Sequence, residues 1–380
     1  MHTSLPPQTH STTLTINLHA IRHNVAYFRS QLAPNTKLMV MVKAFAYGSS
    51  LLEVARVLED CGVDYLAVAY ADEGAILREA GVALPIMVTN PMPNTLATLL
   101  KYQLEPVLYS LNLARALIDF VNKQHVSISA HIKLETGMHR LGLEASDIET
   151  LLQILADQPY IRLQSIYSHL AAVELPQQDV YTQHQVALFQ QIANRIQDHL
   201  QVSLTQHILN TTGIFRFPQY QFDMVRLGIG LHGVGVDPAI QPSLQVVSTL
   251  RTVIAQIKVL PDGATVGYRR KGVARSSMKI ATLAIGYADG FSRALGNGRG
   301  KVWLHGQLAP VVGDVCMDMT MIDITDIHAQ EGDEVIIFGR ELSIGYVAQL
   351  AGTIAYEFLT NVGERVRRIY CTPCECSVHA

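Results

Sequence analysis

The chain has 380 residues, of which 49% are hydrophobic and 16% are charged, and its formal net charge at pH 7 is −3. This composition predicts a globular protein with a large core and excludes an intrinsically disordered chain. Because the net charge lies close to zero, we expect neither nucleic acid nor a membrane surface as a partner.

We expect neither a secretory signal nor a membrane span. The N-terminus lacks a basic region followed by an apolar core, and three prolines and two asparagines interrupt the uncharged stretch 80–100. The five cysteines cannot all pair, and Cys61 and Cys316 have apolar neighbours. These features predict a reducing, cytoplasmic setting.

The two ends of the chain are predicted to be mobile tails. Residues 1–13 are rich in Ser, Thr and Pro, and residues 371–380 follow the last strand-like run. The second tail contains Cys371, Cys374 and Cys376, which resemble half of a zinc site. A second pair of ligands is missing, so we expect no metal site.

Between residues 14 and 241, apolar runs of strand length alternate with helical patterns. Eight strands alternating with helices predict an α/β fold, specifically an N-terminal (β/α)8 TIM-like barrel. The expected strands are 38–43, 63–69, 85–90, 105–110, 127–134, 161–168, 204–210 and 222–228, and the expected helices include 72–80, 111–122, 148–157 and 181–200.

From residue 242 to residue 370, short β-like runs are separated by Gly, Asp and Pro turns, which predicts a C-terminal, mostly-β domain. One helix is expected within it, at 344–350. The expected strands are 253–259, 279–285, 301–304, 309–312, 319–324 and 334–338.

Lys43 ends the first buried strand of the predicted barrel, after the continuous apolar run 38–42. Its ammonium would lose hydration there, which lowers the pKa of the amine and makes it a usable nucleophile. Ser50-Leu-Leu-Glu53 then predicts a capping box at the start of the next helix. For Lys43 alone, a side chain that reaches water from a strand end is the commoner interpretation. In a barrel, however, chemistry is placed where strands end.

Other polar residues also stand at strand ends and their loops, and a barrel brings these positions to one mouth. Cationic, hydroxyl and glycine groups gathered there indicate a phosphate-bearing anionic ligand. A lysine nucleophile beside a phosphate site indicates pyridoxal 5′-phosphate (PLP), bound covalently. Taken singly, each residue also has a structural interpretation, such as a core hydrogen bond or an ion pair. The residues are Lys43, Tyr47, Lys133, Arg140, His169, Asn210, Thr211, Arg226, Gly228 and Ile229.

Residues 228–233 match the dinucleotide pattern G-x-G-x-x-G. No helical pattern opens there, because Asp237-Pro238 follows, and no acidic residue stands about 20 positions later to bind a ribose. We interpret the segment as a glycine-rich loop whose backbone amides can approach a phosphate.

Together these motifs resemble the alanine racemase family, PLP enzymes built from a barrel and a β-domain, over roughly residues 14–370. The resemblance rests on specific motifs in the family's order. They are Val42-Lys43-Ala-x-Ala46-Tyr47-Gly48, Lys133 to Gly142, Tyr167-Ser-His169, Asn210-Thr211, Val225-Arg226-x-Gly228-Ile229, Val266-Gly-Tyr268, Ile285 to Gly290, Cys316-Met-Asp318 and Ile354-Ala-Tyr-Glu357.

The resemblance implies a role for each matched residue. Lys43 carries the cofactor and is one base, and Tyr268 is the opposing base. Arg226 faces the pyridine nitrogen, Arg140 the ring oxygen, and His169 lies against the ring. The resemblance also implies cofactor contacts for Tyr47, Asn210, Thr211, Gly228, Ile229 and Tyr356. It implies substrate contacts for Arg140, Met317, Tyr268 and Tyr287. It further implies that Lys133 is carbamylated, as in some members of the family.

The implied function is the interconversion of L-alanine and D-alanine by two bases, supplying D-alanine for peptidoglycan. The implied assembly is a homodimer with shared sites, because Lys43 lies in the barrel and Tyr268 in the β-domain. A broad-specificity amino-acid racemase and a non-catalytic PLP-binding protein remain alternatives. A PLP decarboxylase is disfavoured, because Arg226 cannot accept a proton from the pyridine nitrogen, which leaves the ring a weaker electron sink.

Five positions depart from the residues common in the family. Arg269 replaces the Gly that usually follows the catalytic Tyr, and a bulky cation there could disturb a tight turn. The other departures are Glu135 for Asp, His232 for Tyr, Asp314 for Arg and Arg367 for Pro. We expect these differences to affect turnover and substrate breadth more than the type of reaction.

Overall fold

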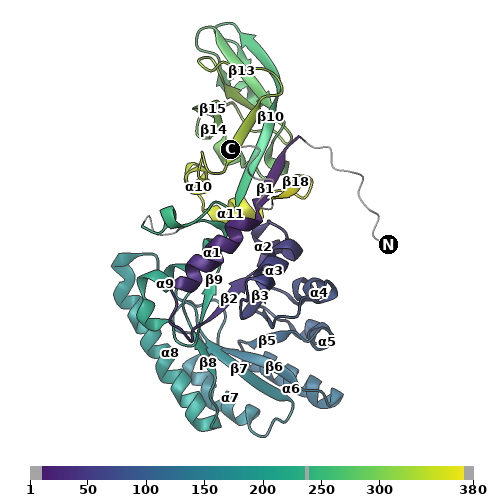
Figure 1. The fold of residues 1–380 in the computed structure, drawn as a ribbon, viewed down its shortest axis with the longest axis vertical. Helices are drawn as coiled ribbons and strands as arrows, with labels where there is room; N and C mark the ends of the chain where they lie inside the picture. Colours follow the sequence, from purple (N-terminus) through teal and green to yellow (C-terminus); the bar gives the residue numbers. More distant parts are fainter. Residues whose placement is uncertain (1–10, 236–238, 372–380) are drawn as a thin grey trace.

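The computed structural model describes residues 11–235 and 239–371 and consists of a barrel and an elongated β-domain (Figure 1). The predicted eight-stranded parallel barrel is confirmed, with strand order β8-β7-β6-β5-β4-β3-β2-β9. The backbone bonds from Asp223 N to Gln206 O (3.1 Å) and from Arg226 N to Leu209 O (3.0 Å) join the segments of β9 and β8. The strands are β2 (Lys37–Met41), β3 (Tyr65–Val68), β4 (Ile86–Val88), β5 (Glu105–Leu108), β6 (Ile128–Lys133), β7 (Ile161–Tyr167), β8 (Thr205–His207) and β9 (Met224–Leu227).

Helices follow the barrel strands because their apolar residues recur on one face. In the helix after β2, Leu51, Val54 and Leu58 are all buried. The predicted capping box is not formed, because the Ser50 hydroxyl bonds to the Glu53 carboxylate and no side chain caps the backbone. The helices are α1 (Leu18–Ser30), α3 (Leu51–Asp60), α4 (Ala71–Glu79), α5 (Leu96–Lys101), α6 (Leu111–Gln124), α7 (Ile148–Leu155), α8 (Asp179–Leu200) and α9 (Thr211–Arg216).

The second domain is an eight-stranded sheet of order β13-β16-β15-β14-β17-β10-β1-β18, in which β10 also pairs with β13. A short separate ribbon joins β11 (Thr265–Val266) to β12 (Gly272–Val273). The sequence predicted one helix here, but a second, α11, follows the first. The other elements are β10 (Ser248–Leu260), β13 (Met278–Leu283), β14 (Lys301–Leu304), β15 (Gln307–Val312), β16 (Thr320–Asp323), β17 (Glu334–Phe338), β18 (Arg367–Cys371), α10 (Ile344–Ala351) and α11 (Ala355–Thr360).

The first strand, β1 (Thr13–Asn17), pairs antiparallel with β10 and parallel with β18. Residues 13–17 therefore belong to the sheet of the β-domain, whereas the sequence assigned residue 14 onward to the barrel. A closed barrel offers no free edge to a ninth strand, and the β-domain sheet does. Thr13 and Cys371 lie in strands rather than in the tails predicted to be mobile. Residues 1–10 and 372–380 lie outside the described residues.

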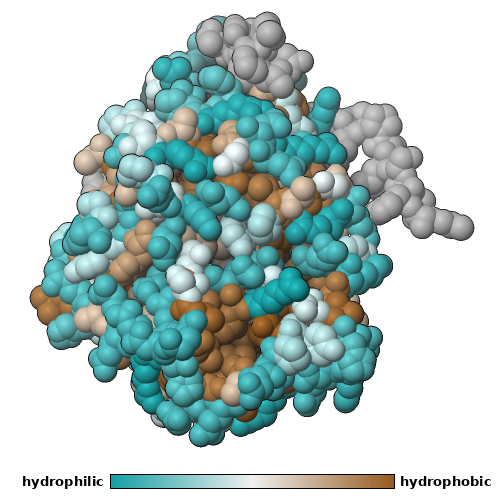
Figure 2. Space-filling model, turned by 60° about the horizontal axis from the view of Figure 1, so that its bottom comes forward, coloured by the Kyte–Doolittle hydropathy of each residue, from teal (hydrophilic) through white to brown (hydrophobic). Residues whose placement is uncertain are grey.

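A continuous cluster of buried apolar side chains runs through both domains and includes Leu14, Phe28 and Phe338. The surface in Figure 2 is mostly hydrophilic, with hydrophobic residues gathered in patches. Such a mixture is ordinary for a folded protein, because polar groups cannot cover its whole surface. Within the described ranges, no helix combines the length and hydropathy needed to cross a membrane.

Candidate functional site

Lys43 follows β2 after one residue, Val42, and opens a turn of unusual handedness. The residues Ala44 to Tyr47 all have φ between 51° and 54°, which is the left-handed region. L-residues rarely adopt this region, so the surrounding structure must hold the turn in place. Gly48 continues it at φ 76°, and a Cβ there would collide with the Leu359 carbonyl of α11. The end of β2 therefore fixes Lys43 within a strained but tightly packed turn.

Glu73 of α4 ties this turn to the neighbouring strand. Its Oε1 accepts from Ala44 N at 2.5 Å, and its Oε2 accepts from Ala69 N at 2.8 Å and Tyr70 N at 3.2 Å. One carboxylate thus bridges the backbone that follows Lys43 and the backbone that follows β3. Such charge-assisted bonds to backbone amides restrain the turn against unwinding.

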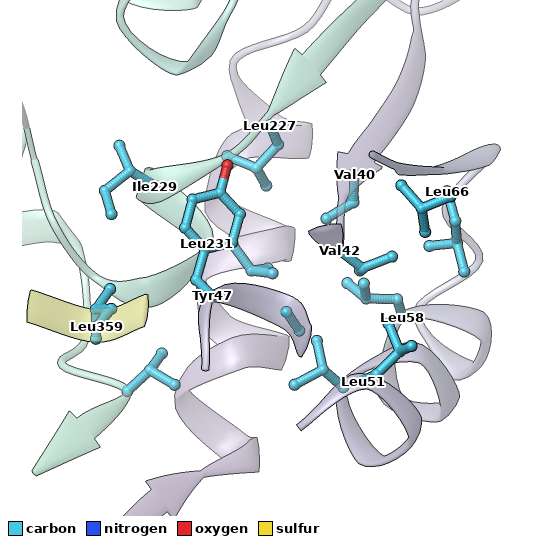
Figure 3. Close-up of a cluster of buried hydrophobic side chains, with 14 of the residues drawn as sticks. Val40, Val42, Tyr47, Leu51, Leu58, Leu66, Leu227, Ile229, Leu231 and Leu359 are labelled. Carbon is cyan, nitrogen blue, oxygen red and sulfur yellow. The ribbon is translucent and has the colours of Figure 1, made fainter. Parts of the chain in front are cut away.

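Tyr47 points from the turn into the apolar wall at the end of β9 (Figure 3). Its side chain reaches toward Leu227, Ile229 and Leu231, and Leu359 of α11 lies on another side. The ring of Tyr47 lies 4.8 Å from that of His232 and 5.8 Å from that of Tyr356. Burial raises the pKa of the Tyr47 hydroxyl above its usual range, so this hydroxyl stays protonated and can donate a hydrogen bond.

Four cationic side chains lie at the barrel mouth, namely Lys43, Lys133, Arg140 and Arg226. Burial, followed by the charge of Arg140, lowers the pKa of the Lys43 amine. Burial also lowers the pKa of Lys133 to about 8, and the charges of Arg140 and Arg226 add to this effect. The positive charges of these residues therefore lie close enough together to lower the pKa values of Lys43 and Lys133. An anionic ligand is the natural complement of such a cluster.

Arg226 is the most firmly anchored of the four. Its Nη1 donates to His207 Nδ1 at 2.8 Å, and its Nη2 donates to Ser168 O at 2.8 Å, Ile208 O at 2.9 Å and His169 Nδ1 at 3.3 Å. Within residues 11–235 and 239–371, no group bonds to its Nε, which leaves that N–H to donate to a ligand. Burial lowers the pKa of Arg226 to about 10, so the guanidinium still carries its charge at neutral pH.

A line of buried hydrogen bonds runs from Arg226 through the barrel interior. His207 Nε2 lies 2.9 Å from Ser165 Oγ, Ser165 Oγ lies 2.6 Å from His131 Nδ1, and His131 Nε2 lies 2.9 Å from Glu105 Oε2. Burial and the charge of Arg226 lower the pKa of His207 well below its usual range, so the ring is neutral. Because a guanidinium can only donate, His207 Nδ1 must accept and its Nε2–H must donate to Ser165.

The loops after β8 and β9 lie beside the Lys43 turn, because β9 pairs with β2. Gly228 N donates to Thr211 Oγ1 at 2.9 Å, and a Cβ at Gly228 would lie 2.9 Å from the Tyr47 hydroxyl. Only glycine leaves room here for a ligand to approach the backbone. Asn210 caps α9, because its Oδ1 accepts from Gly213 N at 3.0 Å, and Ile229 is buried beside these groups.

The remaining predicted site residues come from the β-domain. Tyr287 N and Ala288 N donate to Cys316 O and Met317 O, both at 3.0 Å, so the loops that carry Tyr287 and Met317 are bound together. Tyr268 is 70% exposed, and the pocket it lines is formed by residues 258–321 alone. One chain thus holds Lys43 and Tyr268 in different domains.

Neither Glu73 nor the line of side chains from His207 to Glu105 was predicted from the sequence. His207 could have been found, because it stands on the strand that leads into Asn210-Thr211. The others lie at the middle or beginning of strands or on a helix, where nothing in the sequence separates them from ordinary polar residues. Their importance comes from contacts between strands that are distant in the sequence.

The residues at the mouth fit PLP. Lys43 supplies a partly buried amine, and the free Nε–H of Arg226 suits an unprotonated pyridine nitrogen. The tight space among Gly228, Thr211 and Tyr47 offers the hydroxyls of Thr211 and Tyr47 as donors for a phosphate. These five residues are among those that the sequence assigned to the cofactor.

Comparison with known proteins gives matches over both domains. Residues 16–236 match the alanine racemase N-terminal domain, and residues 247–370 match the alanine racemase C-terminal domain. An alanine racemase of Thermodesulfovibrio yellowstonii is 38% identical over 364 residues, covering 93% of this chain and 96% of that protein.

Solved structures give the same result. An alanine racemase of Clostridium difficile aligns with a TM-score of 0.88 and 31% identity, covering 97% of both chains. An alanine racemase of Bartonella henselae with covalently bound pyridoxal phosphate aligns with a TM-score of 0.87 and 30% identity, covering 95% of this chain and 99% of the other.

Proposed function

Because this chain belongs to the alanine racemase family, we propose that Lys43 and Tyr268 are the two bases that exchange the α-proton of alanine. The chain is a PLP-dependent enzyme that interconverts L-alanine and D-alanine. The observation that carries the assignment of Lys43 is its partly buried amine of lowered pKa, held just after β2 among cations. A neutral amine can both hold the cofactor and accept a proton.

When bound, PLP supplies the electron sink that makes the α-proton removable. Lys43 takes or returns the proton on one face of the substrate, and Tyr268 does so on the other. Arg226 would donate a hydrogen bond to the pyridine nitrogen and so keep it unprotonated, and a ring in that state would be a weaker electron sink that favours prompt return of the proton. Arg140 and Met317 orient the substrate, and Tyr287 narrows the entrance.

We propose that the active enzyme is a homodimer in which the β-domain of one copy covers the barrel mouth of the other. Apolar and aromatic side chains are exposed in both domains, including Phe45 (57%), Met317 (53%) and Ile354 (62%). Covering them would exclude water from the site and bring Tyr268 to Lys43. A two-fold arrangement would give two equivalent shared sites.

We also propose that Lys133 is carbamylated. Carbamylation requires a neutral amine, and a pKa of about 8 leaves an appreciable neutral fraction near pH 8. The product would place a negative charge among Lys43, Arg140 and Arg226, where a cation is costly. We expect a carbamate signal in 13C NMR after incubation with 13C-bicarbonate, increasing from pH 7 to pH 9. The signal should be absent in Lys133→Ala, and its persistence there would contradict the assignment.

The direct test is conversion of L-alanine to D-alanine, followed with an enzyme that oxidises only the D-enantiomer. We expect conversion in both directions, whereas a non-catalytic PLP-binding protein would give none. A panel of other amino acids tests the broad-specificity alternative, which would give comparable kcat/KM for several substrates.

We further propose that the D-alanine supplies peptidoglycan and that the enzyme works in the cytoplasm, in keeping with the free thiols of Cys61 and Cys316.

A further inference from the structure

The hairpin that carries Tyr268 contains a strained backbone. It joins the two-residue strands β11 and β12, and both Arg269 (φ 58°, ψ 14°) and Arg270 (φ 52°) are left-handed. Such conformations are costly for an L-residue, and only glycine adopts them freely. A ribbon of two short strands contributes little stability of its own. Something outside the hairpin must therefore hold it.

Asp314 supplies that restraint. Its Oδ2 accepts hydrogen bonds from Arg269 Nε at 3.1 Å and from Arg269 Nη2 at 2.6 Å, so two nitrogens of the guanidinium bond to one oxygen. Its Oδ1 accepts from Asn297 Nδ2 at 2.8 Å, while Lys271 Nζ (3.8 Å) and Arg293 Nη2 (3.9 Å) lie nearby. The carboxylate is buried and held from both sides, which makes it a rigid acceptor.

The carboxylate remains charged under all working conditions. Hydrogen bonds from Asn297 and Arg269 lower the pKa of Asp314 to about 2. The guanidinium end of the pair is 61% exposed, so solvent screens the attraction and its contribution to global stability is small. The main effect of the Arg269–Asp314 ion pair is therefore to fix the position of Arg269, the residue directly after Tyr268.

We propose that the Arg269–Asp314 ion pair positions Tyr268, holding its hydroxyl where it meets the α-proton. Arg269 and Asp314 are positioning residues, and the proposal rests on the role of Tyr268 proposed above. The two departures from the common family residues are thus linked: an arginine replaces a glycine at a left-handed position, and an aspartate 45 residues later holds that arginine. A glycine at position 269 would adopt the left-handed conformation without an ion pair to hold it.

The test is a rescue experiment on the holoenzyme. Asp314→Asn weakens the grip on Arg269, and we expect kcat to fall about tenfold with little change in KM, because small misplacements of a reacting group are costly. Adding Arg269→Gly to Asp314→Asn should recover most of the lost kcat, because glycine adopts the turn freely. If Asp314 only supported its other neighbours, the double variant would stay as slow as Asp314→Asn.

Isotope effects measured with α-deuterated alanine separate positioning from a general structural defect. In the direction in which Tyr268 removes the proton, Asp314→Asn should raise the isotope effect. In the opposite direction Lys43 removes the α-proton and Tyr268 returns it. Because Asp314→Asn slows the return by Tyr268, removal by Lys43 becomes less rate-limiting, and the isotope effect in this direction should fall. A folding defect would lower activity without moving either value. Asp333→Asn is the matched control, because that carboxylate bonds to His305 and to the backbone of Gln330.

Tyr268→Phe distinguishes failure of this proposal from failure of the base assignment. If Tyr268→Phe retained full racemisation, the base assignment would be wrong whatever Asp314→Asn did. If Tyr268→Phe were inactive while Asp314→Asn left both isotope effects and kcat unchanged, the positioning proposal would be overturned and the base assignment would stand. Circular dichroism and melting temperature verify that each variant is folded.

Discussion

Replacing Lys43 with alanine is expected to lower racemisation by about four orders of magnitude, because the substitution removes both the cofactor anchor and one of the two bases. Loss of a general base alone reduces rates by roughly 10²–10⁴. The left-handed turn should survive, because Ala44 and Gly48 carry its backbone bonds and Glu73 still holds it. The variant should therefore fold normally, as circular dichroism can verify.

The measurement that assigns the covalent bond is borohydride reduction of the holoenzyme followed by peptide mapping. We expect the label on the peptide that contains Lys43. Lys133 is the competing amine, because its pKa is also lowered and it faces the same cations. Lys133→Ala is therefore the matched control and should leave the label on Lys43. A wild-type label on Lys133 would show that the cofactor lysine has been assigned wrongly.

The sequence predicted those features that depend on local pattern. An apolar run ending in Lys43 indicates a buried strand and a desolvated amine whatever lies elsewhere in the chain. The glycines of the segment 228–233 likewise mark a loop whose backbone comes close to another group. The alternation of strands and helices was sufficient to predict the barrel, because its period repeats eight times.

Features that depend on contacts between distant segments were not predictable. The sequence identified Arg269 and Asp314 as separate departures, and only the fold brings one guanidinium to one carboxylate. Glu73 reaches back 29 residues to the amide of Ala44. β1 was assigned to the barrel together with the residues that follow it, although its partners in β10 lie more than 230 residues away. The periodicity of apolar residues identifies a strand or helix, but it does not determine which other strand or helix that element packs against.

Tyr268→Phe is expected to lower racemisation by roughly 10²–10⁴, because the ring is retained while the group that moves the proton is lost. PLP binding should be unaffected, since Tyr268 lies in the β-domain and the proposed cofactor contacts lie chiefly at the barrel mouth. Absorbance of the bound cofactor checks this point. Tyr346→Phe is the matched control, because it also removes a hydroxyl from the β-domain, at a position in α10 outside the proposed site, and should retain activity.

The shared site is tested most directly by mixing the inactive variants Lys43→Ala and Tyr268→Phe under conditions that exchange subunits. A mixed dimer would contain one site with both lesions and one site with neither. With random exchange half of the dimers are mixed and half of their sites are intact, so about a quarter of wild-type activity should return. If each site were built within a single chain, mixing would restore nothing, and no recovery after confirmed exchange would contradict the shared-site account.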